Sequence, residues 1–179
     1  SDKPKNLTTY LEKNEFENTS SNIGMYFDLD LLNERLLDKQ NFEIRRVSDQ
    51  KGLQDFSFVL SNDSDYLHNY FEDVAKILTD DDLQEYYVGY LNHKPIVCGL
   101  ICFSGQVAGL HCLTTSPSER QKGYGTAMQK YRLKRAKDLG YHTAVLQASE
   151  LGYSLYLKLG WQPVCEFKNY INVKLQTFL

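Results

Sequence analysis

Residues 113–126 read Leu113-Thr114-Thr115-Ser116-Pro117-Ser118-Glu119-Arg120-Gln121-Lys122-Gly123-Tyr124-Gly125-Thr126 and join an apolar run to a long amphipathic segment. Between Arg120 and Thr126 the chain carries two glycines, two cations and a hydroxyl. Glycines let a ligand approach the backbone, and the N–H groups of a helix N-terminus attract negative charge. The stretch therefore predicts an anion-binding loop between a strand and a helix. A plain strand-to-helix turn with solvated cations is the alternative, and it explains one glycine better than two.

The length and charge of the chain restrict what it does. Its 179 residues suit one compact domain, and its 20 basic and 23 acidic residues give a net charge of −3. This balance argues against general binding to nucleic acid or to an anionic membrane. The sequence contains neither an apolar run of the roughly 20 residues that span a membrane nor a hydrophobic signal segment. We therefore expect a cytoplasmic protein.

The four cysteines lie in apolar, strand-like runs without the spacing of metal ligands: Cys98, Cys102, Cys112 and Cys165. Buried free thiols are typical of a reducing compartment. We expect neither a disulfide framework nor a metal site.

Hydrophobic spacing predicts a series of elements ahead of the loop. A short helix is expected near Leu7, a loop at 18–22, and then a short strand and one or two helical turns up to residue 37. From residue 41 the pattern is more regular, with a strand, a helix that Ser48 and Asp49 cap, a second helix, and an antiparallel meander. The expected ranges are 42–47, 49–60, 66–78, 84–91, 95–103 and 106–114.

After the loop, a helix from about Gly123 to Leu139 leads to a strand at 143–147, which a helical connection makes parallel to its predecessor. A helix at 150–159 and one or two strands over 161–175 complete the chain. The order predicts a mixed α/β fold with helices on both faces of a mostly antiparallel sheet. We divide the chain into an N-terminal extension, 1–40, and one domain, 41–179.

Two motifs in this arrangement resemble the GCN5-related N-acetyltransferase (GNAT) superfamily over roughly residues 42–175. The run from Arg120 to Thr126 is similar to the family's Arg/Gln-x-x-Gly-x-Gly/Ala loop. Ala148-Ser149 followed by Tyr156-Leu157-Lys158-Leu159-Gly160-Trp161 is similar to its Tyr-x-x-x-Gly-Phe ending. The resemblance implies a sheet whose fourth and fifth strands splay apart, and acetyl-CoA as the acetyl donor.

The resemblance also implies which residues hold coenzyme A. The loop would bind the diphosphate, with oxygens at the glycines and a hydrogen bond from Thr126. The free edge of Leu113, Thr114 and Thr115 would pair with the pantetheine arm like an added strand. Ser149 stands where many relatives carry an asparagine on that arm, or it simply caps the next helix. The loop residues concerned are Arg120, Gln121, Lys122, Gly123, Tyr124, Gly125 and Thr126.

Acetyl transfer to an amine needs a proton donor for the thiolate and a route for the amine proton. Tyr156 matches the family's tyrosine general acid, and a phenol with a pKa of about 10 keeps its proton at neutral pH. Histone acetyltransferases of the family carry a glutamate base where this chain has Gly109. His111 lies two residues later on the same strand face and is a candidate base or water relay, or else a pocket-wall histidine.

Other candidates carry less weight. Sequence does not place Asp82 or Glu85 relative to the acceptor, and His68, His93 and His142 are interpreted as structural or surface residues. If strand alternation holds, Cys112 points away from the face of His111. We therefore expect no acyl-cysteine route.

The sequence thus predicts an N-acetyltransferase that transfers an acetyl group to a primary amine of a small molecule or peptide by direct attack. A module that binds acyl-CoA without turnover is the alternative, since Gly109 supplies no acid. A Rossmann domain is disfavoured because the loop follows an antiparallel meander. We expect no nucleic-acid or membrane partner, and a homodimer stays open. The acceptor would be set by residues of about 48–95.

Overall fold

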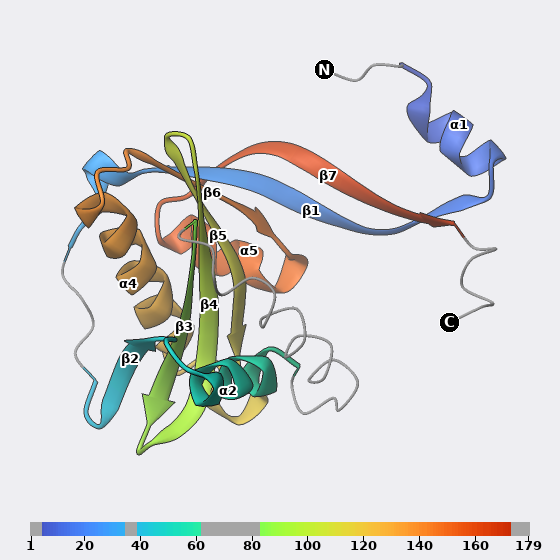
Figure 1. Ribbon diagram of the computed structural model, residues 1–179. Coiled ribbons are helices and arrows are strands. Elements are labelled where there is room, and N and C mark those ends of the chain that lie inside the picture. The colour runs from blue at the N-terminus through green and yellow to red at the C-terminus, as the bar shows by residue number, and fades with distance from the viewer. Residues whose placement is uncertain (1–4, 35–38, 62–82, 173–179) are drawn as a thin grey trace. The chain divides into compact units, whose positions relative to one another are not determined.

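The computed structural model describes residues 5–34, 39–61 and 83–172 (Figure 1). In chain order the elements are α1 (Leu7–Lys13), β1 (Phe16–Asp28), η1 (Leu29–Leu31), β2 (Phe42–Arg46), α2 (Gln50–Ser61), β3 (Gln84–Leu91), β4 (Lys94–Ser104), β5 (Val107–Thr115), η2 (Pro117–Glu119), α4 (Tyr124–Asp138), β6 (Thr143–Ala148), α5 (Glu150–Lys158) and β7 (Gln162–Asn172). The fold is mixed α/β, with a seven-stranded sheet in the order β2-β3-β4-β5-β6-β1-β7.

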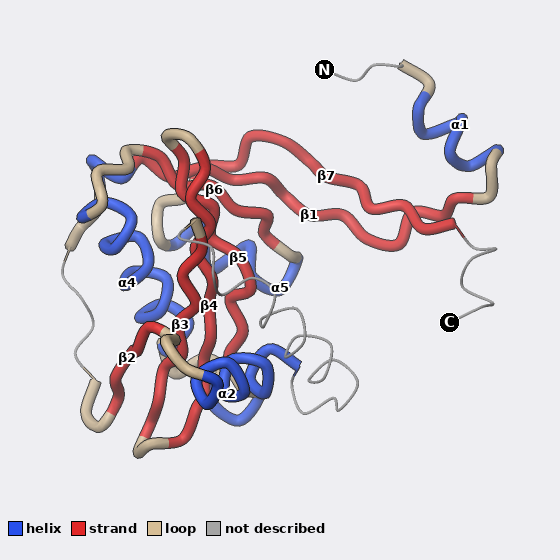
Figure 2. Tube along the Cα trace, viewed as in Figure 1, coloured by secondary structure: helices blue, strands red, loops and turns tan. Residues whose placement is uncertain are grey.

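The chain divides into two compact units, and each unit is described separately. The larger unit is Tyr26–Leu146, and the smaller one combines Ser1–Met25 with Gln147–Leu179. The larger unit holds the antiparallel pairs β2–β3, β3–β4 and β4–β5 and the parallel pair β5–β6. Figure 2 shows these strands side by side. The predicted meander and the predicted parallel strand are both confirmed.

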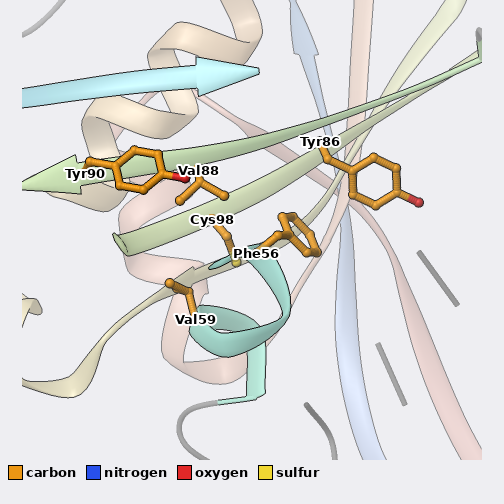
Figure 3. Close-up of a cluster of buried hydrophobic side chains, with 6 residues drawn as sticks. All are labelled: Phe56, Val59, Tyr86, Val88, Tyr90 and Cys98. Carbon is orange, nitrogen blue, oxygen red and sulfur yellow. The ribbon is translucent and has the colours of Figure 1, made fainter. Parts of the chain in front are cut away.

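One face of the meander packs against α2. Tyr86, Val88 and Tyr90 alternate along β3, as side chains of one strand face do, and form a buried cluster with Phe56 and Val59 of α2 (Figure 3). The helix begins as predicted, because Asp49 Oδ1 accepts a hydrogen bond from Gly52 N at 2.7 Å. Apolar burial on this face therefore fixes α2 against the sheet.

The opposite face of the meander packs against α4. Tyr87 alternates with its neighbours and meets Tyr131 of α4 edge-on, with ring centroids 5.4 Å apart. Glu85, only 4% exposed, is bound by Arg135 of α4 at 2.6 Å and by Arg46 at 3.1 Å. The expectation of helices on both faces of the sheet is confirmed.

The smaller unit joins the two ends of the chain. The first part of β1 lies beside β7 (Figure 1), and Thr19 Oγ1 donates to the Asn169 carbonyl at 3.3 Å. The loop predicted at 18–22 is wrong, because those residues lie within β1. Their Asn, Thr and Ser side chains gave a turn signal, but pairing with a distant strand outweighs such local preferences. The helix predicted at 66–78 lies outside the described residues.

Across residues 5–34, 39–61 and 83–172, no helix is both long and apolar enough to cross a membrane. Within the same ranges, no group of three or more acidic, cysteine or histidine side chains is placed to hold a metal ion. The cysteines are free thiols.

Candidate functional site

The loop predicted to bind an anion forms a short 3-10 turn and then the N-terminus of α4. Gln121 and Gly123 both have positive φ angles, 59° and 84°, and Gly123 is the N-cap of α4. The Gly123 carbonyl accepts the first helical hydrogen bond from Ala127 N at 3.0 Å. Anion-binding nests are built from turns that include left-handed residues, and Gln121 and Gly123 supply two such positions in this loop. The strand, loop and helix are therefore arranged as predicted.

Two side chains tie the loop to its surroundings. Arg120 Nε donates to the Thr115 carbonyl at 3.1 Å, which links the loop to the end of β5. Lys122 Nζ lies 3.1 Å from a carboxylate oxygen of Glu119. Both interactions are exposed, so we expect them to position the loop more than to stabilise the fold. Glu119 was not among the predicted site residues, although its i,i+3 spacing to Lys122 is evident in the sequence.

The strands β5 and β6 separate beside this loop. Their register contains the pairs of Val107 with Thr143, Ala108 with Ala144 and Gly109 with Val145. Beyond Gly109, β5 continues to Thr115 while β4 still pairs with Thr114 and Thr115 on its other side. The predicted splay of the fourth and fifth strands is therefore present, counted from β2. It leaves one edge of Leu113–Thr115 without a register partner in β6.

A β-bulge bends β5 at the same place. The register with β4 shifts between Cys98 and Leu100, and Cys112 has a φ of 55°. Cys112 packs against the α2-facing cluster together with Leu100, the register partner of His111. The prediction that Cys112 points away from the face of His111 is wrong, because the bulge interrupts the alternation on which it rested.

Arg132 of α4 satisfies the backbone of this bulge. Its side chain is fully buried, and Nη1 donates to the Leu100 carbonyl at 2.8 Å and to the His111 carbonyl at 2.7 Å. Gly99 makes room for the guanidinium, since a Cβ there would lie 2.7 Å from Arg132 Cζ. A bulge breaks the ladder that would otherwise pair such carbonyls, and a buried carbonyl without a partner is costly. Arg132 therefore fixes the path of β5 toward the loop.

We expect Arg132→Met to lower the free energy of unfolding by about 2 kcal/mol, because two partly buried carbonyls lose a charged donor. Chemical denaturation measures this change. Arg45→Met is the matched control, since Arg45 is exposed and its ion pair with Glu43 contributes little. Equal losses in the two variants would contradict the role of Arg132.

The ring of His111 lies over Gly109. A Cβ at Gly109 would come within 2.7 Å of His111 Nε2, which confirms that the two residues share a strand face and shows why a glycine fits there. Although His111 as a whole is exposed, partial burial of its ring, followed by the positive charge of Arg132, lowers the pKa of the imidazole. His111 is therefore neutral at pH 7 and able to accept a proton.

The other described ionisable candidates lie in structural ion pairs or at the surface. Burial would raise the pKa of Glu85, but hydrogen bonds from Arg135 and Tyr87 outweigh it and lower that pKa, so Glu85 is a poor base. His93 lies in an exposed turn, and His142 lies 3.2 Å from Asp30 at the surface. Asp82 and His68 lie outside the described residues.

The smaller unit carries Tyr156 and Ser149. Tyr156 is buried, 8% exposed, and its ring meets Trp161 edge-on at 5.9 Å between centroids. The ring also lies over Gly152, where an added Cβ would come within 3.0 Å of it. Ser149 caps α5, because Oγ accepts from Gly152 N at 3.3 Å. The local packing thus holds the Tyr156 ring in one orientation.

Sequence reasoning missed one cation at the loop. Lys39, just ahead of β2, donates from Nζ to the Lys122 carbonyl at 2.7 Å. A single lysine in a polar segment gives no local signal, because only the fold brings residue 39 to residue 122.

Comparison with known proteins agrees with this geometry. Residues 49–161 match the family model described as Acetyltransferase (GNAT) family, and no curated protein matches the chain. Solved structures are similar at low identity, which shows a shared fold. A functionally unknown conserved protein from Staphylococcus epidermidis has a TM-score of 0.74 at 17% identity, over 93% of this chain and 66% of that one.

Two further structures carry family names. A GCN5-related N-acetyltransferase from Kribbella flavida has a TM-score of 0.71 at 14% identity, over 92% of this chain and 63% of that one. A predicted acetyltransferase from Clostridium acetobutylicum, solved with acetyl-CoA, has a TM-score of 0.59 at 20% identity, over 69% and 91%. The chain therefore spans just under two thirds of the first two relatives. Because the family model matches more than half of its residues, the chain belongs to the acetyltransferase (GNAT) family, which uses acetyl-CoA.

Proposed function

We propose that this chain is an N-acetyltransferase that transfers the acetyl group of acetyl-CoA to a primary amine of a small molecule or peptide by direct attack. One observation carries the proposal: β5 parts from β6 after Gly109 and ends at a loop whose backbone turns left-handed at Gln121 and Gly123. The free thiols fit a reducing compartment, so we also propose that the protein works in the cytoplasm.

The described residues fit coenzyme A at this place. The free edge of Leu113–Thr115 offers backbone donors and acceptors to the amide groups of the pantetheine arm. Gly123 has no side chain and a positive φ, so phosphate oxygens would approach the backbone at this turn, beside the Lys39 ammonium. Arg120 and Lys122 add positive charge beside them.

When bound, acetyl-CoA supplies a thioester carbon that the amine lone pair attacks, and its C–S bond breaks as the C–N bond forms. Tyr156 gives its hydroxyl proton to the sulfur that leaves and regains a proton from solvent. This role rests on the Tyr-x-x-x-Gly-Trp motif. His111 takes the proton that the amine nitrogen loses, directly or through water. Gly109, beside His111, has no acidic side chain.

We expect His111→Gln to lower kcat about tenfold, because the amine proton loses its acceptor. In the unaltered protein, kcat/KM should fall as the pH drops through a pKa below 6.5, since only the neutral imidazole accepts a proton. The part of this acid limb that belongs to His111 should disappear in the variant, and the part caused by protonation of the acceptor amine should remain. A pH–rate profile measures both effects, and His142→Gln is the control at an exposed histidine. An unchanged profile in His111→Gln would remove His111 from the proton route.

The decisive experiment combines binding and turnover. Titration calorimetry should detect acetyl-CoA binding. A panel of polyamines, amino sugars, aminoglycosides and peptides is then tested as acceptors, and a thiol reagent should detect the free coenzyme A that acetyl transfer releases. Mass spectrometry of the product should show one added acetyl group on nitrogen. The absence of a glutamate at Gly109 favours one alternative, a module that binds acyl-CoA without turnover. Tight binding with no thiol release from any amine would support that alternative.

A further inference from the structure

The ammonium group of Lys39 lies directly on the glycine loop. Besides its 2.7 Å hydrogen bond to the Lys122 carbonyl, Nζ lies 4.8 Å from the centre of the Tyr124 ring. A Cβ built on Gly123 would come within 3.3 Å of the same nitrogen. Two contacts and the closeness of Nζ to Gly123 therefore place this charge at the turn where a phosphate would approach the backbone.

Lys39 differs from the other two cations of the loop in its electrostatic surroundings. Lys122 has a carboxylate partner in Glu119, and Arg120 Nε is engaged by the Thr115 carbonyl. In the part of the chain that the structure describes, no ion pair is found for Lys39. Its hydrogen bond to a carbonyl uses one of the three ammonium N–H groups, and among the described residues its charge faces a carbonyl and the Tyr124 ring, with no carboxylate paired to it.

Lys39 is partly accessible to solvent. The residue is half-buried, and it lines a polar hollow of about 500 Å³. The walls are formed by Lys39, Gln40, Asn41, Phe42, Glu43, Asn92 and His93. The start of β2 is also held against the loop, since the Phe42 and Tyr124 rings lie 4.9 Å apart. A packed segment therefore holds the ammonium beside the loop, whereas the hollow is walled by the start of β2 and the β3–β4 turn and by no residue of 120–126.

We infer that Lys39 is a binding residue for the diphosphate of coenzyme A, with its ammonium on phosphate oxygens at Gly123. The inference rests on the proposed function. The family match begins at residue 49, so no motif assigns this residue. The diphosphate is favoured over the 3′-phosphate because Nζ lies at the first glycine of the loop, where phosphate oxygens would meet the backbone. An ammonium binds phosphate through charge-assisted hydrogen bonds.

Titration calorimetry with acetyl-CoA and with its 3′-dephospho form tests the inference. Lys39→Gln keeps a donor for the Lys122 carbonyl but removes the charge, and it should raise the Kd of both ligands about tenfold. Lys39→Arg keeps the charge and should bind like the unaltered protein. Lys13→Gln, the same change on the exposed face of α1, is the matched control. Lys39→Met gives the same test if Lys39→Gln does not fold.

Each other outcome has a definite meaning. Unaltered affinity of Lys39→Gln for both ligands would overturn the inference and leave Lys39 a structural tether. A loss seen with acetyl-CoA and absent with the dephospho form would also overturn it, because it would assign the charge to the 3′-phosphate. If the unaltered protein binds neither ligand, the proposed function fails instead, which separates the two failures.

Discussion

Gly123→Ala is expected to weaken acetyl-CoA binding about a hundredfold, the largest effect on affinity that we predict. Gly123 has a φ of +84°, and a Cβ built there would lie 3.3 Å from Lys39 Nζ, at the turn where we propose that phosphate oxygens bind. A methyl group there would push the ligand away from several backbone N–H groups at once, and each lost charge-assisted hydrogen bond is costly. Titration calorimetry on the folded variant measures the change.

Backbone strain alone does not explain such a loss, and the chain offers a control for it. Gly140, at the other end of α4, has a φ of +86° and nothing within 4 Å of an added Cβ. Gly140→Ala should cost about as much stability as Gly123→Ala, roughly 1 kcal/mol, since both force alanine into the left-handed region. Its affinity for acetyl-CoA should be unchanged. If the two variants bound acetyl-CoA with equal affinity, the loop at Gly123 would not be the phosphate-binding site.

Tyr156→Phe is expected to lower kcat about a hundredfold with little change in acetyl-CoA affinity, because a positioned general acid contributes roughly that factor. Phenylalanine keeps the edge-on contact with Trp161 and the ring position over Gly152. The variant therefore removes the hydroxyl and preserves the packing. Single-turnover kinetics with a saturating amine measures the step.

Tyr153→Phe is the matched control for this experiment. Tyr153 belongs to the same helix, and its side chain is half-buried. The Tyr153→Phe variant should have the same kcat as the unaltered protein. A normal kcat in Tyr156→Phe would remove Tyr156 from the proton step, and the acid would then have to be another group or water.

Local sequence patterns predicted much of the larger unit. Strong β-formers in alternation gave β3, β4 and β5, and the glycine at residue 140 marked the end of α4, where it adopts a φ of +86°. The loop between β5 and α4 was predicted because its signal is contiguous. Each of these features depends on neighbours along the chain.

Two features that depend on contacts between distant parts of the chain were not predicted. Residues 18–22 have a polar, turn-like sequence, and their place in β1 follows from pairing with β7 at the other end of the chain. The bulge at Cys112 depends equally on tertiary structure, because Arg132 compensates its carbonyls from α4. The division of the chain at residue 40 stays a prediction.

The sequence by itself determined the family and the identity of the loop. The motifs from Arg120 to Thr126 and from Tyr156 to Trp161 are short, and their functional groups come from residues that are neighbours in the chain. Only the tertiary structure decided which other groups surround that loop. Lys39 and Lys122 are brought together by packing of β2 against α4, and the imidazole of His111 owes part of its lowered pKa to Arg132. Contacts and electrostatic fields depend on distance in space and not on distance along the chain. Residues that are far apart in the sequence therefore determine them jointly.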